Sequence, residues 1–172
     1  TVMGDAMAKC YKCRKADMIA RKATIEYLQA GLPYPVMLGN VPVRECPACG
    51  EQAVTIPDAE GLHRALCLHI VRANRALLGQ EVRFLRKYLG WSAEHLSAMM
   101  GVDPKTLSRW ENGRQKLGPV AERFLRILVL QKLEEDAKGF ADQVLPTLGH
   151  EPAAMGESLH MATSRNGWRE AA

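Results

Sequence analysis

Apolar residues recur at three- and four-residue spacings from Asp58 to about Leu133, and this is the pattern of amphipathic helices. We expect five helices in this region, at residues 59–78, 80–89, 92–100, 104–112 and 119–135. The first would be a connecting helix within residues 59–79. The other four would pack into an all-α domain over residues 80–135.

The preceding region, residues 9–58, has no helical period. Turn residues divide it into short apolar runs, ATIEYLQAG, LPYPVMLGN and VPVREC, which are typical of short strands joined by loops. Large apolar residues are too few there to form a separate core. We therefore expect another constraint to hold these strands together.

The two ends of the chain show no sustained pattern. Scattered Gly, Pro, Ser and Thr predict a mostly disordered, flexible tail over residues 136–172, with a short helix near residues 139–145. Residues 1–8 are expected to be disordered or derived from expression, with the first six residues as an expression scar or the product of an upstream start.

Two pairs of cysteines could supply the missing constraint. Cys10 and Cys13 in CYKC, and Cys46 and Cys49 in CPACG, form two C-x2-C motifs separated by 32 residues. Two such motifs can direct four thiolates at one Zn²⁺ ion in tetrahedral geometry. Four thiolates leave no open coordination position, so we expect one structural zinc ion per chain in a β-rich domain over residues 9–58.

Other interpretations of the cysteines stay open. The motifs could be two unrelated turns with buried or free thiols, and a redox dithiol would need a strand-to-helix context that neither motif has. The fifth cysteine, Cys67, is expected to pack as a small apolar residue in the connecting helix. Its neighbours His63 and His69 are expected to be exposed on that helix.

The segment WSAEHLSAMMGVDPKTLSRWENG, residues 91–113, predicts a helix-turn-helix. A helix capped by Ser92 would end at Gly101, a residue that readily adopts the positive φ of a sharp turn. Asp103 and Pro104 would then start a second helix, with Leu107 and Trp110 facing inward. A compact helical domain with a solvated basic face is the alternative.

The outward face of this second helix has the side chains of a major-groove reader. Arg109 could bond to guanine O6 and N7, and Lys105 could contact a second base or a phosphate. The remaining polar side chains suit phosphate oxygens: Thr106, Ser108, Arg114 and Lys116.

The charge distribution agrees with a DNA partner. The formal net charge is only +4, but residues 80–131 carry nine basic and five acidic groups. No stretch is long and apolar enough for a membrane span, and the first residues lack the features of a signal peptide. An odd number of cysteines also suits a reducing compartment, so we expect a cytoplasmic protein. The sequence has no catalytic set and no phosphate-binding glycine loop, so no enzyme is expected.

The last predicted helix, residues 119–135, has more apolar surface than one core-facing stripe needs. Part of it could form a homodimer interface, as a palindromic operator would require. Burial within a single chain is the alternative.

Together, CYKC, CPACGE, the helix EGLHRALCLHIVRAN and GVDPKTLSRWENG resemble the MqsA family of antitoxins, also described as YgiT-type zinc-finger proteins with an XRE-type helix-turn-helix. The resemblance covers roughly residues 8–133. It implies that the four cysteines bind zinc and that the N-terminal domain binds a toxin. In the family an asparagine and an arginine on the reading helix contact bases; the arginine matches Arg109, and Lys105 replaces the asparagine. We therefore expect a preference for guanine over adenine at that position.

The sequence thus predicts an α+β fold: a small β-rich four-cysteine zinc-binding domain, an all-α helix-turn-helix domain and a flexible C-terminal tail. The expected function is a sequence-specific DNA-binding repressor, as an antitoxin that regulates its own operon. A general transcription regulator with a non-toxin protein partner is the alternative.

Overall fold

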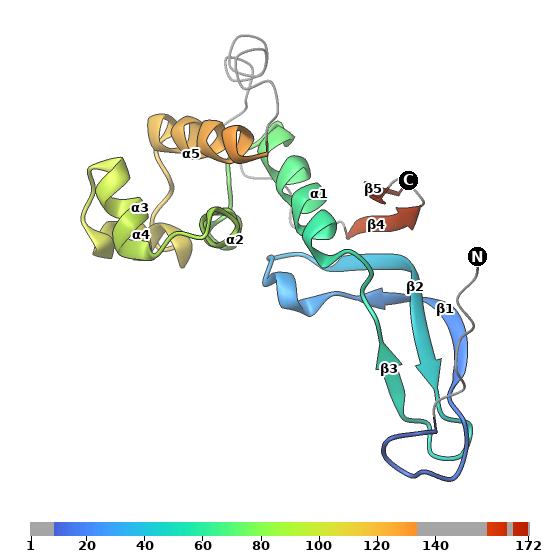
Figure 1. Cartoon of the computed structure of the whole chain (residues 1–172). Helices are drawn as coiled ribbons and strands as arrows, with labels where there is room; N and C mark the ends of the chain where they lie inside the picture. The colour runs from blue at the N-terminus through green and yellow to red at the C-terminus, as the bar shows by residue number, and fades with distance from the viewer. Residues whose placement is uncertain (1–8, 134–157, 165–166, 172) are drawn as a thin grey trace.

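The computed structural model describes residues 9–133, 158–164 and 167–171 of the 172-residue chain. It contains a sheet with a cysteine cluster at one end and a group of helices beside it, with helix α1 (Ala59–Arg72) between them (Figure 1). The predicted fold class is confirmed. The expected disorder of residues 1–8 and the short helix near residues 139–145 lie outside the described residues.

The sheet is built around one long strand, β2 (Val36–Glu45). Strand β1 (Ile19–Glu26) pairs with it in antiparallel orientation, and so does the short β3 (Gln52–Val54) on its other side. A register shift between Ala23 and Ile25 lies opposite Asn40, whose φ of 61° marks a bulge in β2. Val36, Leu38, Val41 and Val43 are all buried, so β2 has the apolar alternation of a half-buried strand on either side of the bulge.

The C-terminal residues correct the sequence prediction. Within the region expected to be a disordered tail, β4 (Leu159–Ser164) pairs in parallel with β2, and β5 (Gly167–Glu170) pairs with β4 in antiparallel orientation. Leu159, Met161 and Trp168 are buried in the core. The sequence pattern did not predict this hairpin, because its strands are short and are stable only on an existing sheet edge.

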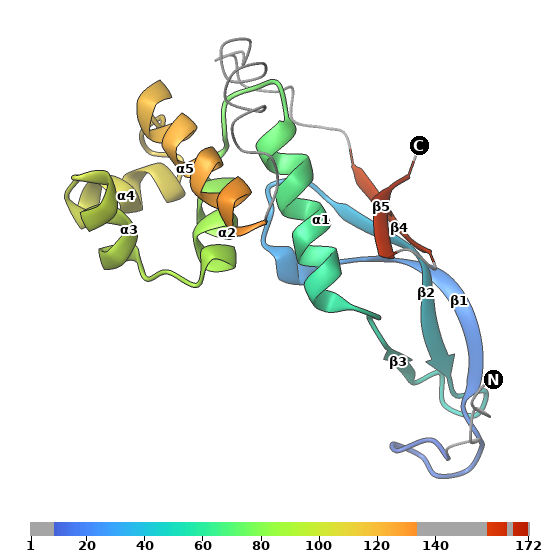
Figure 2. The ribbon, with the colours of Figure 1, turned by 45° about the horizontal axis from the view of Figure 1, so that its top comes forward.

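Helix α1 packs between the sheet and the other helices (Figure 2). Asp58 caps its N-terminus by accepting a hydrogen bond from the backbone N–H of Gly61. Its buried residues are Leu62, Leu66, Cys67, Ile70 and Val71. The helix ends at Arg72, earlier than predicted, and Arg126 binds the carbonyl oxygens of Ile70 and Val71 in its last turn.

The two histidines of α1 differ from their predicted exposed state. His63 Nε2 lies 2.9 Å from Tyr27 Oη, and the His63 ring meets the Phe84 ring edge to face. His69 Nδ1 lies 2.9 Å from Glu170 Oε2. Both histidines therefore join α1 to neighbouring elements.

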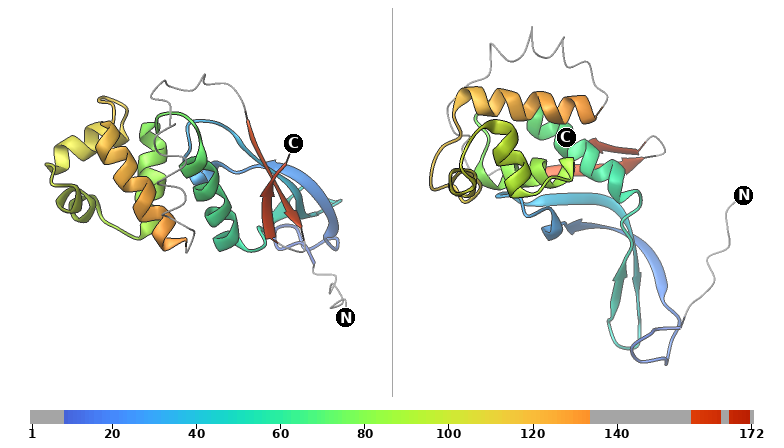
Figure 3. Two further views of the ribbon diagram at one scale, coloured as in Figure 1. Left: turned by 90° about the horizontal axis from the view of Figure 1, so that it is seen from above. Right: turned by 60° about the vertical axis from the view of Figure 1, so that its left-hand side comes forward.

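Four helices form the helical domain, in the order α2 (Gly79–Leu89), α3 (Ala93–Met100), α4 (Pro104–Glu111) and α5 (Pro119–Lys132). Seen from above, α1 lies between this domain and the sheet (Figure 3). One buried carboxylate, Glu81, accepts hydrogen bonds from the Arg75 guanidinium, Tyr34 Oη and the Leu78 backbone N–H. The sheet and the helices therefore share a hydrogen-bonded core with no unsatisfied charge at Glu81.

Candidate functional site

The pairing of β1 with β2 brings the two cysteine motifs together. Cys10 and Cys13 precede β1, whereas Cys46 and Cys49 follow β2. Because the strands are antiparallel, Ile19 at the start of β1 lies opposite Glu45 at the end of β2. The spacer between the motifs is therefore a β-hairpin that returns the chain to the same end of the sheet.

The four sulfur atoms have the spacing of a tetrahedral metal site. Cys10 Sγ lies 3.6 Å from Cys49 Sγ, Cys13 Sγ lies 3.6 Å from Cys46 Sγ, and all four atoms are within 4.8 Å of one another. Zinc–sulfur bonds of about 2.3 Å in a regular tetrahedron place sulfurs about 3.8 Å apart. The donor set and its geometry therefore fit one Zn²⁺ ion, and the five cysteines are free thiols.

Both motifs have the same backbone turn. The Arg14 N–H donates to Cys10 O and the Gly50 N–H donates to Cys46 O, each at 2.9 Å. Arg14 and Gly50 have φ values of 57° and 71°, which lie in the left-handed region that closes each turn. Such turns direct backbone N–H groups toward sulfur, and the Lys15 N–H lies 3.5 Å from Cys13 Sγ.

These N–H groups favour thiolates. The backbone N–H of Cys13 lowers the pKa of the Cys10 thiol from 9.0 to about 6, and that of Lys15 lowers the pKa of the Cys13 thiol. A thiolate is the form that binds a metal. The surroundings of these two sulfurs therefore favour the form that a metal binds, whereas burial raises the pKa of the Cys49 thiol to about 12.

A surface contact joins the two motifs next to the sulfurs. Lys12 Nζ lies 2.6 Å from Glu51 Oε2, and Tyr11 Oη donates to the other carboxylate oxygen of Glu51. The Lys12 ammonium lowers the pKa of Glu51. The contact is exposed, so its contribution to stability is small.

Cys67 lies apart from this cluster, in the middle of α1. Its side chain is fully buried in the apolar core, and burial raises the pKa of its thiol. The prediction that Cys67 packs as a small apolar residue is confirmed.

The second candidate site is the helix pair α3–α4. Ser92 caps α3 by accepting from the His95 N–H, and α3 ends at Gly101 with φ of 65°. Asp103 then caps α4 by accepting from the Lys105 N–H at 2.7 Å. Leu107 and Trp110 are buried, which confirms the predicted inward face of α4. The φ of Gly101 and the two cap hydrogen bonds confirm the predicted turn and caps.

The predicted DNA-reading residues lie on the opposite face of α4 and in the loop after it. Lys105, Ser108 and Arg109 are exposed, whereas Thr106 is half-buried. Arg114 and Lys116 are exposed in the α4–α5 loop. Lys105 and Arg109 are one turn apart, so they lie on the same face of α4.

A buried ion-pair network, which the sequence pattern did not predict, fixes the position of α4. Glu111, at the end of α4, accepts from Arg86 Nε at 2.5 Å and from Arg83 Nε at 3.3 Å. Arg83 also donates to Asn112 Oδ1. Glu111 is buried, so this paired carboxylate holds the C-terminal end of α4 on α2.

A second missed residue is Arg126, which is fully buried in α5. It pairs with Glu122, one turn earlier, with Nη2 2.8 Å from Oε1. Two charges at positions 122 and 126, within the apolar stretch VAERFLRILVL, are the signal that could have identified this pair.

Residues 77–137 match a family profile described as a helix-turn-helix domain. The match includes α2–α5 and ends beyond the described part of this region. A search of curated proteins finds no match. Among the described residues, no helix is long and apolar enough to cross a membrane.

Proposed function

We propose that this protein is a sequence-specific DNA-binding repressor whose N-terminal domain is stabilised by zinc. The observation that carries the proposal is the exposed face of α4. This helix is capped by Asp103, is held in the core by buried side chains, and lies within the region that matches a helix-turn-helix domain. In this proposal residues 9–58 form the zinc-binding domain and residues 80–135 form the DNA-binding domain. Residues 59–79 form the helix that connects the two domains. No enzymatic step is part of it.

The proposed reading mechanism assigns separate roles to the residues of α4 and its loop. Arg109 donates two parallel hydrogen bonds to a guanine, and Lys105 contacts a neighbouring base or phosphate. Backbone phosphates are bound by Thr106, Ser108, Arg114 and Lys116. Binding to a palindromic site over a promoter would then repress transcription by occlusion.

Selection of bound sequences from randomised duplex DNA tests this proposal. The Arg109→Ala variant is expected to bind the selected site about 5- to 150-fold more weakly and to lose preference at one base pair, corresponding to about 1–3 kcal/mol. Lys22→Ala is the matched control, because it removes one exposed charge from β1, far from α4. Equal loss in both variants would show that the effect is one of net charge and would refute the role of Arg109.

The structural zinc ion is supported by the sulfur geometry. Four thiolates fill a tetrahedral ion, so the proposed ion stabilises the fold and has no position for a substrate. Elemental analysis of the purified protein is expected to give one zinc per chain, with Cys46→Ser losing it and unfolding the sheet. Cys67→Ala is the matched control and should keep the ion. Thiols that react fully before chelation would contradict the proposal.

The proposed homodimer uses the exposed end of the helical domain. Val120 on α5 is 81% exposed and Met99 on α3 is 48% exposed, and both line an apolar hollow of about 500 Å³ with Phe124. A second copy of the chain would cover this surface and place two α4 helices on a two-fold DNA site. Val120→Asp is expected to give a monomer in sedimentation. A wild-type protein that stays monomeric at all concentrations would exclude the dimer.

The antitoxin role is proposed from the resemblance to the MqsA family, and it assigns toxin binding to the zinc domain. The second candidate function is a general transcription regulator whose zinc domain binds a different protein. Affinity capture from the native cell, with identification of the bound protein and DNA, distinguishes them. An antitoxin should recover a small toxin encoded beside its own gene.

A further inference from the structure

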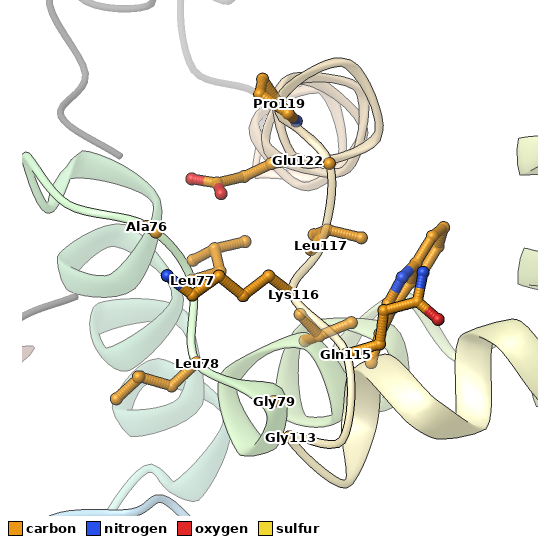
Figure 4. A pocket seen from close by; sticks show the side chains of 13 residues that line it. Ala76, Leu77, Leu78, Gly79, Gly113, Gln115, Lys116, Leu117, Pro119 and Glu122 are labelled. Carbon is orange, nitrogen blue, oxygen red and sulfur yellow. The ribbon is translucent and has the colours of Figure 1, made fainter. Parts of the chain in front are cut away.

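The end of α4 packs directly against the start of α2. Figure 4 shows Gly79 of α2 beside Gly113, the residue that follows Asn112. A Cβ atom at Gly79 would lie 2.8 Å from the backbone nitrogen of Gly113, so there is no space for a side chain between the two backbones. Asn112 is the C-cap of α4, and its backbone N–H donates to the carbonyl oxygen of Ser108 at 3.1 Å. The backbone of Asn112 is therefore fixed, although its side chain is exposed.

The side-chain amide of Asn112 has one orientation that satisfies both of its neighbours. Arg83 Nη2 lies 2.7 Å from Asn112 Oδ1, and a guanidinium group can only donate, so the amide oxygen must face Arg83. On the other side, Asn112 Nδ2 lies 2.8 Å from the carbonyl oxygen of Ser108, which can only accept. Arg83 is itself held by the buried Glu111, with Arg83 Nε 3.3 Å from Glu111 Oε2. The amide group is therefore held in place from the core outward.

This orientation also decides the role of the Ser108 hydroxyl group. Asn112 Nδ2 lies 3.3 Å from Ser108 Oγ, so the amide donates and the hydroxyl oxygen accepts. Among the described residues, the O–H of Ser108 has no acceptor. Ser97 in α3 has the opposite arrangement, since its hydroxyl donates to the carbonyl oxygen of Glu94 at 2.9 Å. Ser108 is exposed, so its O–H is available to a group outside the chain.

We propose that Asn112 is a positioning residue for DNA binding, because it donates to the Ser108 hydroxyl oxygen and so directs the Ser108 O–H toward a DNA phosphate. This inference rests on the proposed function, in which Ser108 contacts the DNA backbone. An ionised phosphate oxygen accepts hydrogen bonds and cannot donate them, so Ser108 must present its proton to it. Without Asn112, the hydroxyl would be free to donate to a carbonyl oxygen of its own helix, as Ser97 does.

A double-mutant cycle tests this role, measured by fluorescence anisotropy of a labelled duplex with the sequence that the wild-type protein selects. Asn112→Ala is expected to weaken binding about two- to fivefold, because the Ser108 hydroxyl is no longer directed outward. In a chain that also carries Ser108→Ala, the same change should have no effect. An equal loss in both backgrounds would mean that Asn112 acts on DNA directly or only through the fold, and would overturn the proposal. Wild-type affinity in Asn112→Ala would overturn it as well.

Asn112→Asp is expected to reverse the hydroxyl without changing the size of the side chain at position 112. One carboxylate oxygen would accept the Ser108 proton, so the hydroxyl would turn its lone pairs toward the phosphate. We expect the loss of affinity to be about threefold larger in the wild-type background than in the Ser108→Ala background. Gln115→Glu adds the same charge to the adjoining loop, and this matched control should lose the same affinity in both backgrounds. Equal losses for Asn112→Asp would contradict the proposal.

A measurement without DNA separates this inference from the proposed function. In NMR spectra of the free protein, Ser108→Ala should move one of the two side-chain amide proton signals of Asn112 upfield, since that proton loses its acceptor. Unchanged signals would refute the contact itself. A wild-type protein that selects no DNA sequence would refute the repressor function and the role of Asn112 with it. Additive variants on a selected duplex would refute the role of Asn112 alone.

Discussion

The guanidinium group of Arg126 lies 2.6 Å from the carbonyl oxygen of Val71, so a side chain of α5 caps the C-terminal end of α1. The same group donates to the carbonyl oxygens of Ile70, Ala73 and Arg75. The carbonyl oxygens of Ile70 and Val71 belong to the last turn of α1, where a helix leaves carbonyls short of intrahelical donors, whereas Ala73 and Arg75 follow the helix. The contact fixes the angle between the connecting helix and the helix-turn-helix, and through α1 it relates the cysteine domain to the DNA-reading face.

Replacement of Arg126 by Met is expected to reduce the free energy of unfolding by about 3–5 kcal/mol. The variant leaves Glu122 as an unpaired buried carboxylate and leaves the carbonyls of α1 without donors. Urea denaturation measures the change, with Arg109→Met at an exposed position as the control. The double variant Glu122→Leu with Arg126→Met should recover part of the loss, and a double variant less stable than Arg126→Met would contradict this explanation.

A single methyl group at Gly79 is expected to separate α2 from α4. A Cβ atom there would lie 2.5 Å from the carbonyl oxygen of Trp110 and 2.8 Å from that of Glu111, and both are backbone atoms that cannot turn away. We expect Gly79→Ala to lower stability by about 1–3 kcal/mol and to weaken DNA binding. Gly118→Ala is the matched control, because no atom lies within 4 Å of its Cβ position. Equal melting temperatures of the two variants would refute the close contact.

Stability should fall in mild acid because of His63. Burial lowers the pKa of His63 below 6.5, so the unfolded state binds more protons than the folded state between the folded pKa and 6.5. The contribution of His63 is therefore complete above about pH 6.5 and is lost as the pH falls toward the folded pKa. Thermal unfolding with excess zinc, at about pH 7.5 and about pH 5.5, should show a smaller pH effect in His63→Gln than in the wild type. A variant with the same pH dependence as the wild type would exclude His63 as the cause.

The C-terminal hairpin is expected to stabilise the sheet through Trp168. Its indole Nε1 donates to the carbonyl oxygens of Pro57 and Asp58, at 3.0 and 3.1 Å, and its ring is buried against the start of α1. Trp168→Phe should cost about 1 kcal/mol through the lost hydrogen bonds, and Trp168→Ala about 3–5 kcal/mol through lost burial. Denaturation of both variants measures the difference. Two variants as stable as the wild type would show that β4 and β5 add nothing to the fold.

The helices and the cysteine turns could be predicted because their signals are local. Residues three or four apart share a face of a helix, so apolar spacing predicts helices. Asp103 is the N-cap of α4 and Pro104 is its first residue, so the signal lies where the helix begins. Each C-x2-C motif forms a turn from its own residues. The sequence predicted strands between the two motifs, but their antiparallel pairing and register came from the structure. The helices and the turns needed little information about distant residues.

Tertiary structure decided the features that depend on contacts far along the chain. Arg126 and Val71 are 55 residues apart, and Trp168 and Pro57 are 111 residues apart. A buried guanidinium is stable only where several carbonyl oxygens meet it, and a short strand is stable only where a sheet edge is open to pair with it. Neither the carbonyl oxygens around a guanidinium nor an open sheet edge can be inferred from the periodicity and capping signals of the sequence. The sequence therefore determined the five helices and the paired cysteine motifs, whereas packing determined where α1 ends, how the C-terminal hairpin joins the sheet, and how the buried charges of Glu81, Glu111 and Arg126 are paired.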